Sequence, residues 1–158
     1  MSETISGRSD FGSFYEDLEI GDIIEHWPGK TITEGDNNVF SLLTMNHHPV
    51  HIDQNYAHEQ HHKKVLVVGT LTFSVVIGMS VSDISGKAIA NLGYKNITHD
   101  NPVFIGDTIY AKTEVLHKRI CKTNPGRGIV HVKTRAYNQT EDLVLTLERN
   151  VLLPRQEV

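Results

Sequence analysis

Three polar residues, Asn46, His48 and His51, lie around Pro49 in the stretch Leu42–Asp53. A proline fixes its own φ at about −65° and disfavours helical geometry at the residue before it, so a helix that reaches Asn46 must stop and turn. The turn is expected to present His51 on a rigid loop. An amide and an imidazole on either side of a fixed bend can converge on one small molecule or one water. A neutral imidazole, with an unperturbed pKa of about 6.5, can also act as a base at neutral pH.

The same stretch resembles the motif of the MaoC-like (R)-specific enoyl-CoA hydratases. That motif runs small residue, Gly, Asp, any residue, Asn, Pro, aliphatic residue, His. The positions that match it are Thr44, Pro49, Val50 and His51. The positions that depart from it are Met45 in place of glycine, Asn46 in place of the aspartate that serves as an acid/base, and His48 in place of asparagine. The order of the later elements extends the resemblance to residues 14–154.

The resemblance implies reversible hydration of a trans-2-enoyl-CoA to an (R)-3-hydroxyacyl-CoA, with no cofactor. In this chemistry His51 takes a proton from the attacking water, Asn46 holds that water, and the Gly69 backbone N–H stabilises the thioester oxygen. Further contacts with the substrate are expected from Thr44, His48, Pro49 and Thr70. Because Met45 and His48 alter the pocket beside the catalytic turn, the expected substrates include branched or dicarboxylic ones such as mesaconyl-CoA.

The asparagine at position 46 leaves three readings of this chemistry open. An amide can orient a water or a carbonyl, but it cannot take a proton. In the first reading His51 is the sole proton acceptor and Asn46 positions the water; in the second, another acid, Asp36 or Asp53, reaches the site. In the third reading the chain binds an acyl-CoA without hydrating it. A thioesterase on the same fold is a weaker alternative, because no carboxylate stands at the matching position.

A cluster of histidines raises the question of a metal site. Its members are His47, His48, His51, His58, His61 and His62. Zinc sites usually pair histidine with cysteine or glutamate at regular spacing; the sequence holds no CxxC, and its one HExxH pattern, at His58–His62, runs directly into Lys63 and Lys64. We therefore predict no metal, and interpret His61–Lys64 as a solvated turn that leads into the following helix.

The chain has 158 residues, a length that indicates a single domain, and its net charge is −4. This balance argues against nucleic acid or a membrane surface as a partner. One cysteine, Cys121, cannot form an intramolecular disulfide and fits a reducing cytoplasm. Residues 1–13 are polar, lack the apolar core of a secretory signal, and are predicted to be a mobile tail before a domain at 14–158.

The order of the expected elements indicates an α+β fold. A first strand over Ile23–Ile32 is followed by a capping-box signal at Thr33–Asp36 and a helix with one apolar face, made by Val39, Phe40, Leu42 and Leu43. Asp53 is placed to cap a short helix that runs through residues 56–60. Gly69–Ser82 is apolar nearly all round, which predicts a core helix buried on all sides rather than a membrane span.

The rest of the chain changes to β-rich runs. These runs are Ala88–Leu92, Val103–Val115, Gly128–Tyr137 and Leu143–Leu153. One buried helix followed by long strands is best satisfied by a curved antiparallel sheet wrapped around that helix, the hot-dog fold that the resemblance also implies.

Two expectations concern partners. An acyl-CoA carries phosphates, so basic residues should line its channel, although a solvated outer sheet face is the better reading for any one of the candidates. Those candidates are Lys112, Arg119, Lys122, Arg127, Lys133 and Arg135. Sheet edges also need covering, which predicts a two-fold homodimer or a larger assembly of dimers.

Overall fold

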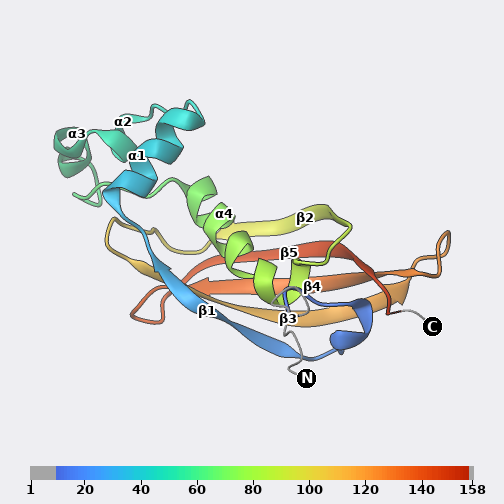
Figure 1. Ribbon diagram of the computed structural model, residues 1–158. Coiled ribbons are helices and arrows are strands. Elements are labelled where there is room, and N and C mark those ends of the chain that lie inside the picture. Colours follow the sequence, from blue (N-terminus) through green and yellow to red (C-terminus); the bar gives the residue numbers. More distant parts are fainter. Residues whose placement is uncertain (1–9, 157–158) are drawn as a thin grey trace, which may run out of the picture.

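The fold is a five-stranded antiparallel sheet with one helix lying across it. The structure is a computed structural model that describes residues 10–156. The sheet has the strand order β1-β3-β4-β5-β2. The strands are β1 (Ile23–Thr31), β2 (Ala90–His99), β3 (Thr108–Ile120), β4 (Arg127–Tyr137) and β5 (Leu143–Pro154). Figure 1 shows helix α4 across one face of the sheet, and this arrangement confirms the predicted hot-dog fold.

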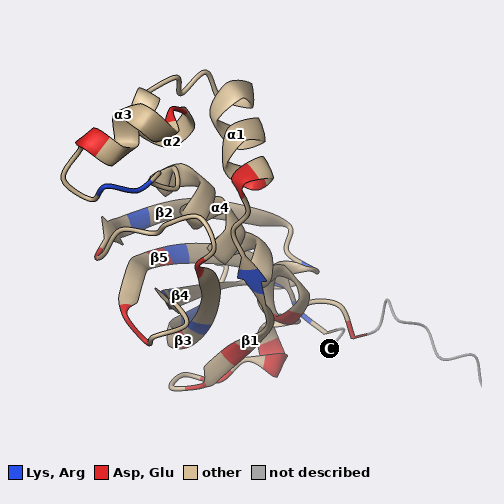
Figure 2. Ribbon diagram, turned by 90° about the vertical axis from the view of Figure 1, so that its left-hand side faces the viewer, with Lys and Arg blue, Asp and Glu red and all other residues tan. Residues whose placement is uncertain are grey.

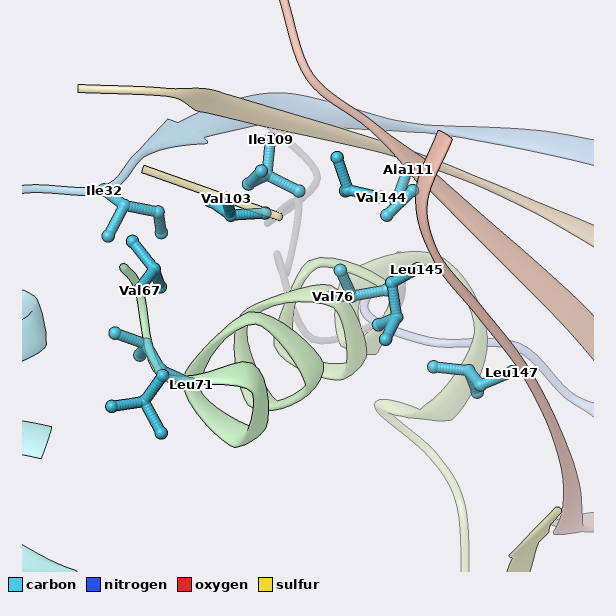
Figure 3. Close-up of a cluster of buried hydrophobic side chains, with 12 residues drawn as sticks. Ile32, Val67, Leu71, Val76, Val103, Ile109, Ala111, Val144, Leu145 and Leu147 are labelled. Carbon is cyan, nitrogen blue, oxygen red and sulfur yellow. The ribbon is translucent and has the colours of Figure 1, made fainter. Parts of the chain in front are cut away.

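Helix α4 (Gly69–Met79) provides the centre of the core. Its Leu71 and Val76 pack against inward-facing residues of the sheet such as Ile109 and Leu145 (Figure 3). These strand residues recur at every second position because alternate side chains of a strand point to the same face. The helix is predicted correctly, but it ends at Met79 and the chain continues as a π-helical turn, η2 (Val81–Ser85).

The prediction that this helix is buried on all sides is wrong within one chain. Thr70, Ser74 and Gly78 are exposed. They recur at a spacing of four residues and therefore share one face of the helix. The sheet covers only the opposite side of α4, so this face has no cover from the described part of the chain.

The boundaries of two strands differ from the sequence prediction. β2 runs to His99 rather than Leu92, because Thr98 and His99 pair with Thr146 and Leu145 of β5. β3 begins at Thr108 rather than at Val103. A tight turn precedes it, in which the Asp107 carboxylate accepts a hydrogen bond from the Phe104 N–H at 2.8 Å and Gly106 has a φ of 93°.

The end of the predicted N-terminal tail is packed on the domain. The Gly12 N–H donates to the Ser82 carbonyl at 2.6 Å, and the Ser13 N–H donates to the Ile84 carbonyl at 3.2 Å. These two backbone groups are therefore held beside η2. The part of the predicted tail at residues 1–9 lies outside the described residues.

Three helices project beyond one end of the sheet, above the start of α4 (Figure 1). They are α1 (Glu34–Leu43), α2 (Pro49–Ile52) and α3 (Gln54–Glu59). The predicted capping box is present, with Thr33 and Asp36 exchanging side chain–backbone hydrogen bonds at the start of α1. No helix within residues 10–156 has the length and apolar character needed to cross a bilayer.

Helix α1 has the predicted apolar residues at helical spacing, but of these four only Phe40 packs against the core cluster. Its buried residues are Asn37 and Ser41. Val39, Leu42 and Leu43 are 66%, 59% and 79% exposed. The spacing of apolar residues is helical, but the side that turns inward is set by the polar groups of the chain beneath α1, which Asn37 binds.

Candidate functional site

The turn that follows α1 is built by backbone hydrogen bonds. The Thr44 hydroxyl donates to the Phe40 carbonyl at 2.6 Å, and the Asn46 N–H donates to the Ser41 carbonyl at 2.9 Å. Met45 between them has a φ of 59°, which is the left-handed region. That conformation is unfavourable for a residue with a side chain and easy for glycine, which explains physically why a glycine suits this position.

His51 lies on a helical turn rather than on the loop that the sequence predicted. α2 is a single turn in which Pro49 occupies the first position, where its missing N–H costs no helical hydrogen bond. The His48 ring caps this turn, since its Nδ1 accepts from the Val50 N–H at 3.2 Å. Pro49 therefore starts a helix instead of only ending one.

The ring of His51 is held in one orientation by a backbone carbonyl. Its Nδ1 lies 2.8 Å from the Leu66 carbonyl oxygen, which can only accept, so Nδ1 must carry the proton. In the neutral ring Nε2 is then the free acceptor. Since the side chain is half-buried, this nitrogen is available as a base toward a bound molecule.

A residue that sequence reasoning missed, Asn37, connects His51 to helix α4. Its side-chain N–H groups donate to the carbonyls of His51 at 2.9 Å and Leu66 at 3.2 Å. Its Oδ1 accepts from the N–H of Val68, the residue before α4, at 2.9 Å. Asn37 is 1% exposed, so these bonds are shielded from water. The feature of the sequence that could have pointed to Asn37 is an amide side chain within the first turns of an amphipathic helix.

Gly69 opens α4, as predicted, and lies against an imidazole. A Cβ added to Gly69 would lie 2.8 Å from Cε1 and 2.9 Å from Nε2 of His99, closer than real side chains approach. A side chain at position 69 would therefore have to displace the His99 ring, and the helix N-terminus that could stabilise a thioester oxygen is the same place. Thr70, the next residue, is exposed beside it.

The structure links the predicted residues to different degrees. Leu66 and Asn37 join His51 to the start of α4 through the hydrogen bonds above. Asn46 accepts a long bond of 3.4 Å from the His48 N–H, and no group within residues 10–156 accepts from its side-chain NH₂. That donor remains available for a ligand. The His48 and His51 rings meet edge to face, with centroids 6.0 Å apart.

Neither of the two acids considered as replacements for the family aspartate is left free. Asp36 accepts from the Thr33 N–H at 2.8 Å and from the Lys30 ammonium at 2.7 Å. The hydrogen bond from Lys30 is the main reason that the pKa of Asp36 is lowered to about 2. Asp53 caps α3, as predicted, by accepting from the Tyr56 N–H at 3.0 Å. Both carboxylates are therefore engaged at helix starts.

A cavity of about 580 Å³ lies on one side of His51. Asn37, His51, Lys63, Lys64 and Phe104 contribute to its wall, together with Glu34, Asn38, Ile52, Gln54, Asn55, His58, Val65 and Ile105. Lys64 also lies over the Phe104 ring, 5.2 Å from its centroid. Asn46, Gly69 and Thr70 do not line this cavity.

The basic residues of this cavity are not those that the sequence suggested. Lys63 and Lys64 lie on the loop that follows α3, coloured blue in Figure 2. None of the six strand and turn candidates lines the cavity. Two of them are paired at the sheet surface, Lys112 with Glu25 at 2.6 Å and Arg135 with Glu114 at 3.1 Å. Within residues 10–156 no three His, Cys, Asp or Glu side chains are grouped to hold a metal ion.

Comparison with known proteins gives a consistent result. Residues 17–138 match the family described as MaoC like domain. The chain is 31% identical over 150 residues to the mesaconyl-CoA hydratase of Cereibacter sphaeroides, a match that covers 95% of this chain and 43% of that protein. It is also 30% identical over 115 residues to the (R)-specific enoyl-CoA hydratase of Aeromonas caviae, covering 73% of this chain and 81% of that protein.

A solved structure extends the comparison to the fold. RV0216 of Mycobacterium tuberculosis, a protein with a double hotdogfold, superposes on this chain with a TM-score of 0.84 at 25% identity. The match covers 92% of this chain and 45% of that one. The chain therefore spans less than half the length of the first curated relative and of this structure.

Proposed function

The chain belongs to the family of MaoC like domains, and from this we propose that it catalyses the reversible hydration of a trans-2-enoyl-CoA to a 3-hydroxyacyl-CoA. The observation that carries the proposal is the hydrogen bond from His51 Nδ1 to the Leu66 carbonyl. This bond leaves Nε2 as a base, and Asn37 ties the same segment to the start of α4.

The proposed reaction uses one base and one pair of fixed donors. His51 Nε2 takes a proton from water as the water oxygen bonds to C3 of the enoyl group. Asn46 holds that water through its free side-chain NH₂. Negative charge develops on the thioester oxygen and is stabilised by the Gly69 N–H at the positive end of the α4 dipole. C2 then receives from His51 the proton that the ring took from water, which completes the addition of water without a cofactor.

For the substrate we propose an enoyl-CoA with a branched or dicarboxylic acyl group. This proposal is supported by the similarity to a protein named mesaconyl-CoA hydratase over 95% of the chain. It is also supported by the charge of the cavity beside His51. The wall of this cavity carries two ammonium groups, those of Lys63 and Lys64, and one carboxylate, that of Glu34. A ligand with phosphates or a second carboxylate matches that charge.

For the assembly we propose a two-fold homodimer, or a larger assembly of dimers, of a single domain over residues 14–158. β2 forms one edge of the sheet and exposes Leu92, Tyr94 and Ile97. An open edge with apolar side chains needs a cover. A second unit of the same fold is a suitable cover, since the similar RV0216 holds two such units in one chain. The free thiol of Cys121 accords with the cytoplasmic setting that we also propose.

The test is turnover of a panel of enoyl-CoAs, including mesaconyl-CoA, by the wild-type chain and a His51→Ala variant. Losing general-base catalysis should reduce kcat by about 10²–10⁴-fold. Asn46→Ala should cost less, because the water loses its holder but not its base. A folded His51→Ala variant with wild-type turnover would contradict the mechanism.

A second candidate function is non-catalytic binding of acyl-CoA. The observation that favours it is Asn46, which cannot accept a proton where the related motif has an acid. This candidate predicts that the wild-type chain turns over no enoyl-CoA in the panel. It also predicts that His51→Ala and Asn46→Ala leave the affinity for a CoA ester unchanged, which calorimetry can measure.

A further inference from the structure

The imidazole of His99 occupies the space beside Gly69 where any other residue would have a side chain. His99 is the last residue of β2, and Gly69 is the first residue of α4, thirty positions earlier. The nearest ring atoms, Cε1 and Nε2, lie 2.8 Å and 2.9 Å from the position of a Cβ on Gly69, and Nδ1 lies at 3.3 Å. The ring therefore lies directly against the backbone at the start of the helix.

Both ring nitrogens of His99 are without a protein partner in the described part of the chain. Within residues 10–156 no hydrogen bond, ion pair or ring contact engages the side chain of His99, which is exposed, while its backbone pairs with Leu145 of β5. Three other histidines differ in this respect. A ring nitrogen of His26, of His48 and of His51 is hydrogen-bonded to another group of the protein. His99 is thus a free donor next to the proposed reaction centre.

The backbone at this point offers a second free donor. The Val68 N–H is taken by Asn37, whereas no acceptor within the described residues engages the N–H of Gly69. The first N–H groups of a helix lack partners within the helix and lie at its positive end. A free N–H and a free imidazole therefore border the same space, and neither is satisfied by the protein.

We propose that His99 is a further catalytic residue, whose ring N–H donates a hydrogen bond to the thioester carbonyl oxygen of the substrate. This inference rests on the proposed function and adds a second donor to the Gly69 N–H. A neutral ring carries one N–H, so no proton is transferred to or from His99. His51 still takes the proton of water as the C3–O bond forms, and the charge that reaches the thioester oxygen is shared between two donors.

The role predicts an effect on the chemical step rather than on binding alone. An oxyanion is a stronger acceptor than the ground-state carbonyl, so its donors act mainly on the transition state. Removing one such donor typically lowers kcat by about 10²–10³-fold. His99→Phe keeps a planar ring of similar size against Gly69 but removes both nitrogens. His117→Phe, at an exposed histidine of β3 away from the site, is the matched control.

The experiment measures kcat and KM for the wild-type, His99→Phe and His117→Phe proteins on the enoyl-CoA that the wild type hydrates. We expect His99→Phe to lower kcat by about 10²-fold, with a smaller change in KM, while His117→Phe matches the wild type. Wild-type kcat in folded His99→Phe overturns the inference and leaves the hydratase function intact. Absence of turnover in wild type and control alike overturns the proposed function, and this inference with it.

A spectroscopic readout covers the case in which His99→Phe does not fold. His99→Gln keeps an N–H donor and His99→Ala removes it, and both place a smaller group against Gly69. Difference Raman spectra of bound butyryl-CoA should show a thioester C=O stretch at lower frequency in the wild type and His99→Gln than in His99→Ala. The same C=O frequency in the wild type and His99→Ala would show that His99 donates nothing to this oxygen.

Discussion

Asn37→Ala should damage both stability and catalysis, because one side chain holds three buried backbone groups. The bonds measure 2.9 Å to the His51 carbonyl, 3.2 Å to the Leu66 carbonyl and 2.9 Å to the Val68 N–H. Each such bond has a net worth of about 1 kcal/mol, so their loss lowers the free energy of unfolding by about 3 kcal/mol. The Val68 N–H is in addition left buried without a partner, which adds to this cost.

The catalytic effect follows from the same geometry. The Leu66 carbonyl still orients the His51 ring in the variant, but the backbone of His51 and the start of α4 lose their common anchor. A misplacement of about 1 Å in an active site can cost about 10²-fold in rate, so kcat should fall by about 10- to 100-fold. Urea unfolding at fixed protein concentration and steady-state kinetics measure the two effects.

Asn37→Asp separates the donor from the acceptor function of this amide. The carboxylate still accepts from the Val68 N–H but points its other oxygen at two carbonyls, which also carry negative partial charge. We expect it to be at least as destabilising as Asn37→Ala. Asn150→Ala is a control, since Asn150 is a half-buried strand residue whose side chain bonds to no group in residues 10–156. If Asn37→Ala has the stability and kcat of the wild type, Asn37 does not anchor His51 to the start of α4.

Four further predictions follow from particular residues. Met45→Gly should raise the free energy of unfolding by about 1 kcal/mol, because glycine adopts the φ of 59° without strain, whereas Met45→Ala should not; urea unfolding tests this, and equal effects of the two changes would contradict it. The double change Lys63→Gln and Lys64→Gln should raise KM for the acyl-CoA and leave kcat nearly unchanged, with the difference shrinking at high salt; a KM equal to that of the wild type would exclude a role in binding. The pKa of Asp36 is lowered to about 2 from 3.8, so its contribution to stability is present above about pH 4 and lost as the pH falls toward 2. Asp36→Asn should remove that part of the acid sensitivity in thermal melts between pH 4 and 2, and unchanged sensitivity would argue against it. Light scattering at micromolar concentration should give the mass of a dimer or a multiple of it, and a mass of 17.7 kDa would refute the proposed assembly.

Signals between near neighbours in the chain were enough to predict most elements. The capping box at Thr33 and Asp36, the cap at Asp53 and the start of α4 at Gly69 are all found where the sequence places them. Caps and helix starts depend on hydrogen bonds over three or four residues, so they are readable without knowledge of the fold. The change from helical to strand periodicity after α4 likewise predicted the layer arrangement.

Contacts between distant segments decided what the local pattern could not. The helical spacing in α1 predicted an apolar face, but whether that face turns inward depends on the chain opposite it, and Asn37 turns inward because unpaired groups of His51, Leu66 and Val68 lie there. β2 reaches His99 because β5 pairs with it, not because its own residues demand a strand.

The chemistry of the site divides in the same way. A motif of eight residues made His51 the candidate base, because the turn at Pro49 and the residue types are properties of the local chain. The rest of the site depends on contacts between distant segments. These are the bond from His51 to the Leu66 carbonyl, the cavity wall that includes two lysines, and the contact of His99 with Gly69, thirty residues earlier. Only the packing of the helices against the end of the sheet brings them together, since no spacing within one element encodes that distance.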